Sequence, residues 1–371
     1  MKKLKITLIG PVWPFRGGIA QLNESLAAEL TAAHHQVNVV SLTTQYPSIL
    51  FPGKSQFTDA PKPDSLNAER CISSINPFTW FAAANKIAAQ APDLVIVRYW
   101  TPFMAPALGT IVGRLRAKGI KVLAITDNII PHERHFYDNI CARYFLKATS
   151  AVLYMSKEVG RELDEIFHYD RPSVFSPHPI YDVYGQRVSR TQACLELGLD
   201  AGKQYVLFFG FIRDYKGLDL LLQAWQPTPG RELIVAGEFY ADREKFMPLI
   251  EEKKVILHDI YIPEHRVKLY FSAASLVVQP YKTATQSGVT QIAYNFGVPM
   301  VVTNVGGLPE IVPDSRVGFV VDPCAKAIEG AINRFFDQEL ETQFRKNIEQ
   351  EKKRFDWSTM VCRIEELAQK I

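Results

Sequence analysis

Residues 205–219 read Tyr-Val-Leu-Phe-Phe-Gly-Phe-Ile-Arg-Asp-Tyr-Lys-Gly-Leu-Asp, and this stretch decides the fold. The run Tyr205–Phe209 is continuously apolar, which is typical of a strand buried on both faces of a parallel sheet. A turn at Gly210 follows, and a helical pattern begins near Gly217. Because ligands bind at the carboxyl edge of parallel sheets, Arg213 and Lys216 are placed to hold an anion such as a diphosphate. A solvated basic turn is the alternative.

The same alternation of apolar runs and helical patterns extends over most of the chain, which predicts βαβ units and parallel sheets. The other predicted strands are Ile6–Ile9, Val37–Leu42, Leu94–Val97, Val122–Ile125, Ala151–Tyr154, Leu233–Ala236, Val255–Leu257, Leu276–Gln279, Pro299–Thr303 and Gly318–Val321. A Pro-rich stretch from Ser176 to about Ser189 interrupts this alternation. We therefore expect an α/β fold with two doubly wound, Rossmann-like domains. The first covers residues 1–183 and the second residues 184–355, while residues 43–80 are expected to be irregular.

Composition excludes several classes of protein. The chain has 371 residues with 42 basic and 39 acidic side chains, so it lacks the strong basic excess of a dedicated nucleic-acid binder. Its five cysteines are far apart, which argues against a disulfide scaffold or a structural zinc site. No run approaches the ~20 apolar residues of a membrane span, and the first apolar run is too short for a secretory signal. These features predict a cytoplasmic location.

The charge is distributed unevenly along the chain. Up to Gly185 there are 19 basic and 15 acidic residues, whereas the remainder is close to neutral. This excess favours an anionic partner or a membrane surface for the first domain. A chance difference between two solvated surfaces is the alternative.

Four further segments follow predicted strands and carry polar or glycine residues. Gly17 and Gly18 lie in the turn after the first strand, where a glycine backbone can approach a ligand. Ser287 is placed to cap a helix, so that the amides of the segment Gln286–Gln291 would form an anion cradle. His132 lies in a polar cluster after Ile125, and its spacing to His135 does not fit a zinc motif. The fourth segment is the paired-glycine turn Gly306–Glu310. The alternatives are a plain glycine turn at Gly17-Gly18, a simple helix cap at Ser287 and a surface histidine at His132.

Together these elements resemble the family-4 retaining glycosyltransferases of the GT-B fold, over nearly the whole chain. The matching stretches are the Gly17-Gly18 turn, Asp127 to Glu133, Gly210 to Asp219, Gly306 to Glu310 and the terminal helix that begins at Asp356-Trp357-Ser358. The resemblance implies two domains facing each other across a cleft, with the helix over residues 356–371 completing the first domain. It also implies transfer of a sugar from a nucleotide sugar without a metal or other cofactor, which agrees with the absence of a D-x-D motif.

The resemblance assigns roles to individual residues. Arg213 and Lys216 would hold the donor diphosphate and stabilise the leaving group, and His132 would be catalytic from the first domain. Donor-binding residues would be Gly17, Gly18, Glu238, Phe239, Gln286, Ser287, Gly288, Val289 and Thr290. The implied acceptor is a glycan or a lipid-linked saccharide in cell-surface polysaccharide synthesis, with peripheral contact to the inner membrane surface.

One departure from the family affects the donor site. The family carries two glutamates eight positions apart, where this chain has Ala284 and Ile292, and no acidic residue lies between Glu264 and Glu310. Neutral groups such as Gln286, Ser287, Thr290 or Gln291 would then take over their roles. A nucleotide-sugar 2-epimerase and a non-catalytic glycosyltransferase-like partner subunit remain alternatives.

Overall fold

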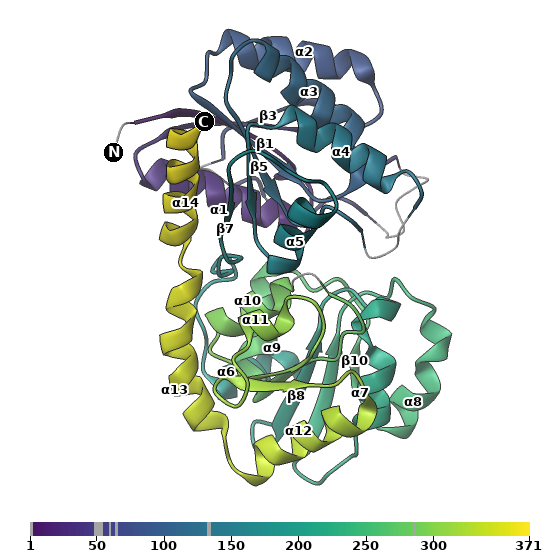
Figure 1. The fold of residues 1–371 in the computed structure, drawn as a ribbon. Helices are drawn as coiled ribbons and strands as arrows, with labels where there is room; N and C mark the ends of the chain where they lie inside the picture. The colour runs from purple at the N-terminus through teal and green to yellow at the C-terminus, as the bar shows by residue number, and fades with distance from the viewer. Residues whose placement is uncertain (1–2, 48–54, 59–60, 64–65, 132–134, 285–286) are drawn as a thin grey trace. The chain divides into compact units, whose positions relative to one another are not determined.

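The computed structural model describes residues 3–47, 55–58, 61–63, 66–131, 135–284 and 287–371. The chain divides into two compact units (Figure 1). Unit 1 comprises Met1–His178 together with Asp356–Ile371, and unit 2 comprises Pro179–Phe355.

The sheet of unit 1 has seven strands within the described residues, in the order β3-β2-β1-β4-β5-β6-β7. All neighbouring strands in it are parallel. The strands are β1 (Lys5–Ile9), β2 (Gln36–Thr44), β3 (Ala68–Ser73), β4 (Leu94–Tyr99), β5 (Val122–Thr126), β6 (Ala151–Tyr154) and β7 (Ser173–Phe175). Ile6 of β1 pairs with Val37 on one side and Leu94 on the other. The strand order therefore reverses between β1 and β4.

Helices cover both faces of this sheet. They are α1 (Gly18–Ala32), α2 (Pro77–Ala89), α3 (Ala105–Ala117), α4 (Asp138–Ala148), α5 (Lys157–Glu165) and α14 (Trp357–Lys370), with a short 3₁₀ turn, η2 (Pro102–Met104). Helices α2, α3 and α4 pack side by side on one face, and α1 and α14 pack together on the other (Figure 1). In α14, Met360, Ile364 and Leu367 are spaced by four and three residues and are all buried against unit 1.

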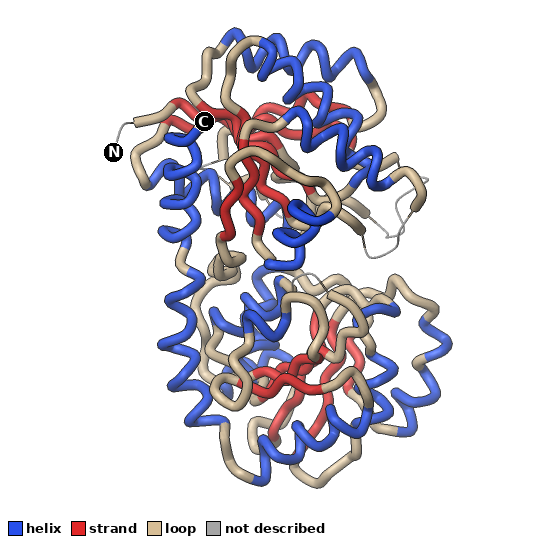
Figure 2. Tube along the Cα trace, in the orientation of Figure 1, coloured by secondary structure: helices blue, strands red, loops and turns tan. Residues whose placement is uncertain are grey.

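Unit 2 is built around a second parallel sheet, shown in red in Figure 2, with six strands among the described residues. Its order is β10-β9-β8-β11-β12-β13. The strands are β8 (Gln204–Phe209), β9 (Arg231–Ala236), β10 (Ile256–His258), β11 (Leu276–Gln279), β12 (Met300–Thr303) and β13 (Gly318–Val321). Here the order reverses between β8 and β11.

The helices of unit 2 are mostly short. They are α6 (Arg190–Leu197), α7 (Leu218–Ala224), α8 (Met247–Glu252), α9 (Glu264–Ala273), α10 (Gly288–Asn295), α11 (Leu308–Ile311), α12 (Ala325–Asp337) and α13 (Glu341–Glu351). The 3₁₀ turns are η3 (Asp214–Lys216), η4 (Arg243–Lys245) and η5 (Lys352–Phe355). The core packs apolar side chains of β8, β9, β11 and β12 against α7 and α12. These strands are buried on both faces, as their apolar sequences predict.

The prediction of two parallel sheets with helices is confirmed, but the expectation that residues 43–80 are irregular is wrong in part. This stretch contains the edge strand β3 and the start of α2. The β3 sequence Ala-Glu-Arg-Cys-Ile-Ser has two exposed charged residues, Glu69 and Arg70, and therefore lacks a continuous apolar run. Within the described residues, no helix has the length and apolar character needed to cross a membrane.

Candidate functional site

The candidate site lies at the carboxyl ends of β8 and β11 in unit 2. In an open α/β sheet, a crevice for ligands forms where the strand order reverses, outside the carboxyl ends of the strands. The segment 210–217 follows β8, and the segment that leads into α10 follows β11. A Cβ atom built on Gly210 would lie 3.1 Å from Nζ of Lys216 and 3.7 Å from Cγ2 of Val289. The two segments therefore meet at this point.

Lys216 ends the η3 turn and is only 9% exposed. Its Nζ atom lies 5.8 Å from the ring centroid of Tyr281. Burial, with a further contribution from the charge of Arg213, lowers the pKa of Lys216 to about 7. Among the described residues, the ammonium has no hydrogen-bond or ion-pair partner, and so it is poised to meet an anion. The alternative of a solvated basic turn does not hold for Lys216, because its side chain is buried beside the ring of Tyr281.

Arg213 stands three residues before Lys216, in extended backbone, and is partly exposed. Its guanidinium carbon lies 5.1 Å from the ring centroid of Tyr240, which also packs against Phe211 at 4.6 Å. The aromatic contact holds the cation without neutralising it. The loop after β8 thus presents two positive groups of different geometry.

Gly217 allows the loop to pass close to the end of β11. Its φ is +68°, and a Cβ atom there would lie 2.0 Å from the carbonyl oxygen of Pro280. An L side chain would therefore combine an unfavourable backbone conformation with a severe clash. The fold requires glycine here in order to place Lys216 at the carboxyl ends of β8 and β11.

The N-terminus of α10 lies at the same end of the sheet and presents backbone amide donors there. Ser287 is the N-cap residue, but its side chain does not cap the helix. Its Oγ instead donates to Oε1 of Gln279 at 2.6 Å and lies 3.3 Å from the hydroxyl of Tyr281. The first-turn amides of α10, near Gly288, Val289 and Thr290, consequently have no side-chain cap. Uncapped amides and the helix dipole favour an anion at this end.

Two buried glutamine side chains in β11 and α10 have amide atoms without a hydrogen-bond partner. Gln279, at the end of β11, is 1% exposed, and its Nε2 has no hydrogen-bond partner. Gln291, one turn into α10, is fully buried, and neither its Oε1 nor its Nε2 has a partner. Unpaired buried amides are costly and rare in folded proteins. Sequence reasoning missed Gln279, for which a polar residue at the end of the apolar run LVVQ was the available signal.

Glu238 and Phe239 lie after β9, the strand next to β8. Glu238 is buried, and its carbonyl oxygen accepts a hydrogen bond of 2.9 Å from the amide of Ile212 in the β8 loop. Phe239 is partly exposed and packs against Phe246 at 5.7 Å. Both residues therefore border the loop that carries Arg213.

In unit 1, Gly17 and Gly18 lie at the start of α1, after the carboxyl end of β1. Gly17 is the N-cap, with φ +103°. Near the same edge, Arg98 at the end of β4 is 1% exposed and forms a bidentate pair with Asp127, at 2.6 and 2.5 Å. Sequence reasoning overlooked Arg98, although a charge inside the run LVIVRY was visible.

Two predicted site residues lie outside the described residues. They are His132, in the segment after β5, and Gln286, just before α10. Their proposed roles stay predictions.

Comparisons with known proteins agree with this architecture. The model of "Glycosyltransferase Family 4" matches residues 16–180, and the model of "Glycosyl transferases group 1" matches residues 193–355. Among solved structures, sucrose-phosphate synthase from Thermosynechococcus elongatus has a TM-score of 0.76 at 18% identity and covers 98% of each chain. Anabaena HepE in complex with UDP has a TM-score of 0.74 at 16% identity, covering 99% of this chain and all of the other. These structural likenesses show that the chain has the GT-B fold.

Curated relatives match a smaller part of the chain than the solved structures do. D-inositol 3-phosphate glycosyltransferase of Mycolicibacterium paratuberculosis is 30% identical over 186 residues, which are 47% of this chain and 42% of that protein. The corresponding protein of Segniliparus rotundus is 35% identical over 147 residues, or 37% of this chain and 32% of its own length. The chain thus spans less than half the length of these relatives. Together with the family models, they support a glycosyltransferase.

Proposed function

We propose, on the premise of a GT-B fold whose two parts match glycosyltransferase family models, that this protein transfers a sugar from a nucleotide-sugar donor to an acceptor hydroxyl. The observation that carries the proposal is the buried ammonium of Lys216, which has no partner among the described residues. A diphosphate would supply the missing negative charge. The complex of HepE with UDP supports a nucleotide donor for this fold.

The chemistry follows from where charge develops. As the bond between the anomeric carbon and the diphosphate oxygen breaks, the leaving group gains negative charge. Lys216, Arg213 and the first-turn amides of α10 are already oriented toward this end of the sheet, so they would stabilise the transition state more than the ground state. These fixed positive groups would stabilise the leaving diphosphate as a metal ion does in other enzymes, and we therefore propose a metal-independent reaction. Retention of configuration is proposed from the resemblance to family 4.

We propose the remaining contacts to the donor from where each residue lies in its unit or in the sequence. Glu238 and Phe239 would border the nucleotide base, and Gly17, Gly18 and His132 would contribute from unit 1. The stretch between Glu264 and Glu310 lacks acidic residues, so neutral groups would recognise the donor sugar. Besides Gln286, Ser287 and Thr290, we add the unsatisfied amides of Gln279 and Gln291.

The acceptor is proposed as a glycan or lipid-linked saccharide, used in cell-surface polysaccharide synthesis on the cytoplasmic side of the membrane. The curated relatives are named for D-inositol 3-phosphate, which supports a polyhydroxylated acceptor. The attacking group would then be a hydroxyl that loses its proton as the new glycosidic bond forms.

A thermal-shift panel of nucleoside diphosphates and nucleotide sugars tests the donor site. At a ligand concentration of about 100 Kd, binding adds roughly 2.7 kcal/mol. For a unit of this size, that is a rise in Tm of roughly 5–10 °C. Arg213→Ala should reduce the rise for the cognate diphosphate without lowering the Tm of the free protein.

Arg334→Ala is the matched control. Its guanidinium also lies over an aromatic ring, that of Phe319 at 4.7 Å, but it belongs to the last turn of α12, away from the carboxyl ends of β8 and β11. If no nucleoside diphosphate raises Tm, or if Arg334→Ala weakens binding as much as Arg213→Ala, the proposed donor site is wrong. Binding without sugar transfer to any acceptor would instead indicate the non-catalytic partner subunit.

A further inference from the structure

The sheet of unit 1 has its own point at which the strand order reverses, between β1 and β4. In open α/β sheets, ligands bind outside the carboxyl ends of the strands at such a point. Three residues stand at this edge: Gly10 directly follows β1, Arg98 is the penultimate residue of β4, and Asp127 directly follows β5. None of them takes part in the proposed donor site.

Arg98 and Asp127 form a pair that is buried at one end and open at the other. Nε and Nη2 of Arg98 donate to Oδ2 and Oδ1 of Asp127 at 2.6 and 2.5 Å. The Arg98 side chain is 1% exposed, whereas that of Asp127 is 18% exposed. The backbone of Asp127 is also held, because its amide donates to the carbonyl oxygen of Tyr99 at 2.9 Å. The pair therefore presents a carboxylate of fixed orientation to solvent.

Two polar atoms at this edge have no hydrogen-bond partner among the described residues. They are Nη1 of Arg98 and Oδ1 of Asn23, a fully buried residue of α1. The other amide atom of Asn23, Nδ2, donates to the carbonyl oxygen of Pro11 at 2.8 Å. A Cβ atom on Gly10 would lie 2.5 Å from that Nδ2 and 3.2 Å from Cβ of Arg98, so the glycine lets both side chains pack at the end of β1. A hydroxyl group can both accept and donate a hydrogen bond, which is the chemistry that the two unpaired atoms require.

An ion pair is not what the fold itself demands at this position. Arg98 interrupts the run LVIVRY of β4, whose other residues are apolar or aromatic and buried. Apolar residues of similar volume often replace a buried ion pair without loss of stability, because the cost of desolvating two charges offsets their attraction. A buried N–H group without a partner adds a further cost. A charged pair with a spare donor therefore points to a ligand.

The charge of this pair differs from that of the donor site in unit 2. There, the buried ammonium of Lys216 has no partner among the described residues, which suits a diphosphate. Arg98 is instead neutralised by Asp127, and the part of the pair that reaches solvent is the carboxylate. A carboxylate repels phosphate but accepts hydrogen bonds from hydroxyl groups, and Arg98 occupies only one lone pair on each of its oxygens. These features favour a neutral, polyhydroxylated ligand over an anionic one.

We propose that Asp127 binds a hydroxyl group of a neutral saccharide acceptor, and that Arg98 is the positioning residue that orients its carboxylate. The spare donor of Arg98 and the spare acceptor of Asn23 provide the adjoining polar contacts. The inference rests on the proposed sugar transfer and adds the residues of unit 1 that recognise the acceptor.

Saturation-transfer-difference NMR on the full-length protein tests this binding. The probes are the methyl pyranosides of glucose, galactose, mannose and rhamnose. Spectra are recorded with and without carbon-linked analogues of UDP-glucose, ADP-glucose and GDP-mannose, which cannot transfer their sugar. We expect saturation transfer to at least one pyranoside, and we expect it to persist when the analogue is present. Loss of the signal on adding an analogue would place the saccharide in the donor site and overturn the proposal, as would the absence of saturation transfer to every pyranoside.

Single variants separate contact from positioning. Asp127→Asn removes the charge but keeps the size, and it should weaken pyranoside binding about tenfold, because hydrogen bonds to an ionised acceptor are roughly twice as strong as neutral ones. Arg98→Met keeps the carboxylate but not its orientation, and it should also weaken binding. Arg98→Lys should restore only part of the affinity, since an ammonium does not hold both carboxylate oxygens as a guanidinium does.

The same variants distinguish this inference from the proposed donor site. The rise in Tm that a nucleoside diphosphate produces should be the same in Asp127→Asn as in the wild-type protein. If no nucleoside diphosphate raises Tm, the donor site is wrong, while the dependence of pyranoside binding on Asp127 still stands. If Asp127→Asn weakens diphosphate binding and leaves pyranoside binding intact, the assignment of Asp127 to the acceptor is wrong.

A double variant guards against loss of folding, because removal of one partner of a buried ion pair is strongly destabilising. Arg98→Met/Asp127→Leu replaces both partners by apolar groups, so it should keep the wild-type Tm and abolish pyranoside binding. A double variant that folds and still binds the pyranoside would overturn the proposal. A markedly lower Tm would show that the fold needs the pair, which would equally count against it.

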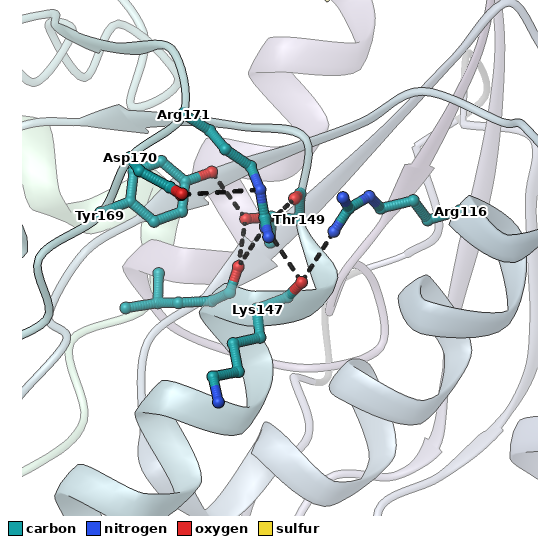
Figure 3. A network of polar contacts seen from close by, with 7 residues as sticks. Arg116, Lys147, Thr149, Tyr169, Asp170 and Arg171 are labelled. Carbon is teal, nitrogen blue, oxygen red and sulfur yellow. Dashed lines mark hydrogen bonds and ion pairs between the residues drawn. The ribbon is translucent and has the colours of Figure 1, made fainter.

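Arg171 supplies the matched control at the opposite edge of the same sheet, just before β7. Its guanidinium donates to three carbonyl oxygens at the carboxyl end of α4, those of Leu146, Lys147 and Thr149, at 3.2, 3.0 and 2.6 Å (Figure 3). Its Nε lies 4.0 Å from the carboxylate of Asp170, which is largely exposed. Arg171→Met should lower Tm through the loss of these hydrogen bonds but leave pyranoside binding unchanged. Equal weakening of binding by Arg171→Met and Arg98→Met would reduce the effect of Arg98 to one on stability and overturn its positioning role.

Discussion

Replacing Lys216 with methionine should stabilise the free protein while removing its affinity for a diphosphate. The two side chains have similar length, but methionine carries no charge into the buried site. Burial lowers the pKa of Lys216 from 10.5 to about 7, and each pKa unit corresponds to about 1.4 kcal/mol. The charge therefore costs the fold at most roughly 4–5 kcal/mol at neutral pH. Allowing for relaxation and the neighbouring Arg213, we expect Lys216→Met to gain about 2 kcal/mol, or roughly 4–8 °C in Tm.

The pH dependence gives this prediction a distinct signature. Between about pH 7 and 10.5 the unfolded chain binds a proton at Lys216 that the folded chain does not, so the wild-type protein gains stability as pH rises. Below pH 7 the lysine is protonated in both states, and its full cost is present. The advantage of Lys216→Met should therefore be largest at or below pH 7 and disappear toward pH 10.5.

Differential scanning fluorimetry across this pH range measures the effect. Calorimetry in two buffers of different ionisation enthalpy adds a second readout, because diphosphate binding near about pH 8.5 should take up close to one proton. A variant that is less stable than wild type at pH 6, or a stability difference that does not change with pH, would refute the account of Lys216. Diphosphate binding that survives in Lys216→Met would remove this residue from the site.

Two other substitutions test the packing of the site. Gly217→Ala should lower the free energy of unfolding, measured by urea denaturation, by well over 3 kcal/mol, because its Cβ would lie 2.0 Å from the Pro280 oxygen. Gly198→Ala is the control: Gly198 is also in the left-handed region but has open space around it, so the loss should be only about 1 kcal/mol. Similar losses in both variants would contradict the close approach at Gly217. Gln291→Met should raise the free energy of unfolding by about 1–2 kcal/mol, because neither polar atom of the Gln291 amide has a hydrogen-bond partner. A clear loss of stability would show that the amide is hydrogen-bonded in solution.

Much of the fold could be predicted from apolar runs. Strands buried on both faces, such as β5 and β8, leave continuous apolar sequences, and the glycines after them mark the turns. The edge strand β3 and the three-residue β7 have neither signature, because an edge strand is half solvated and a very short strand carries no period. Their positions depend on neighbours that are distant in sequence.

The site could be predicted only in outline. Cations after β8 and a serine before α10 were visible in the sequence, and the structure brings both segments together at the carboxyl ends of β8 and β11. The burial of Lys216 was not predictable, because its neighbour Tyr281 is more than sixty residues away along the chain. Similarly, Ser287 has the residue type and position of a helix cap, but its hydroxyl donates a hydrogen bond to the Gln279 side chain instead.

Helix α14 has a consequence for the order of folding during synthesis. It packs on unit 1, and its Glu365 meets the buried ring of His35 at 3.0 Å, although all of unit 2 is translated between these two residues. Unit 2 is a continuous segment, whereas unit 1 lacks α14 until residues 356–371 have been synthesised. Until then, the surface of unit 1 against which α14 packs stays uncovered. Unit 1, whose synthesis begins first, therefore completes its packing last. A nascent chain released after residue 355 would expose that surface, and chaperones that bind apolar segments would find it there.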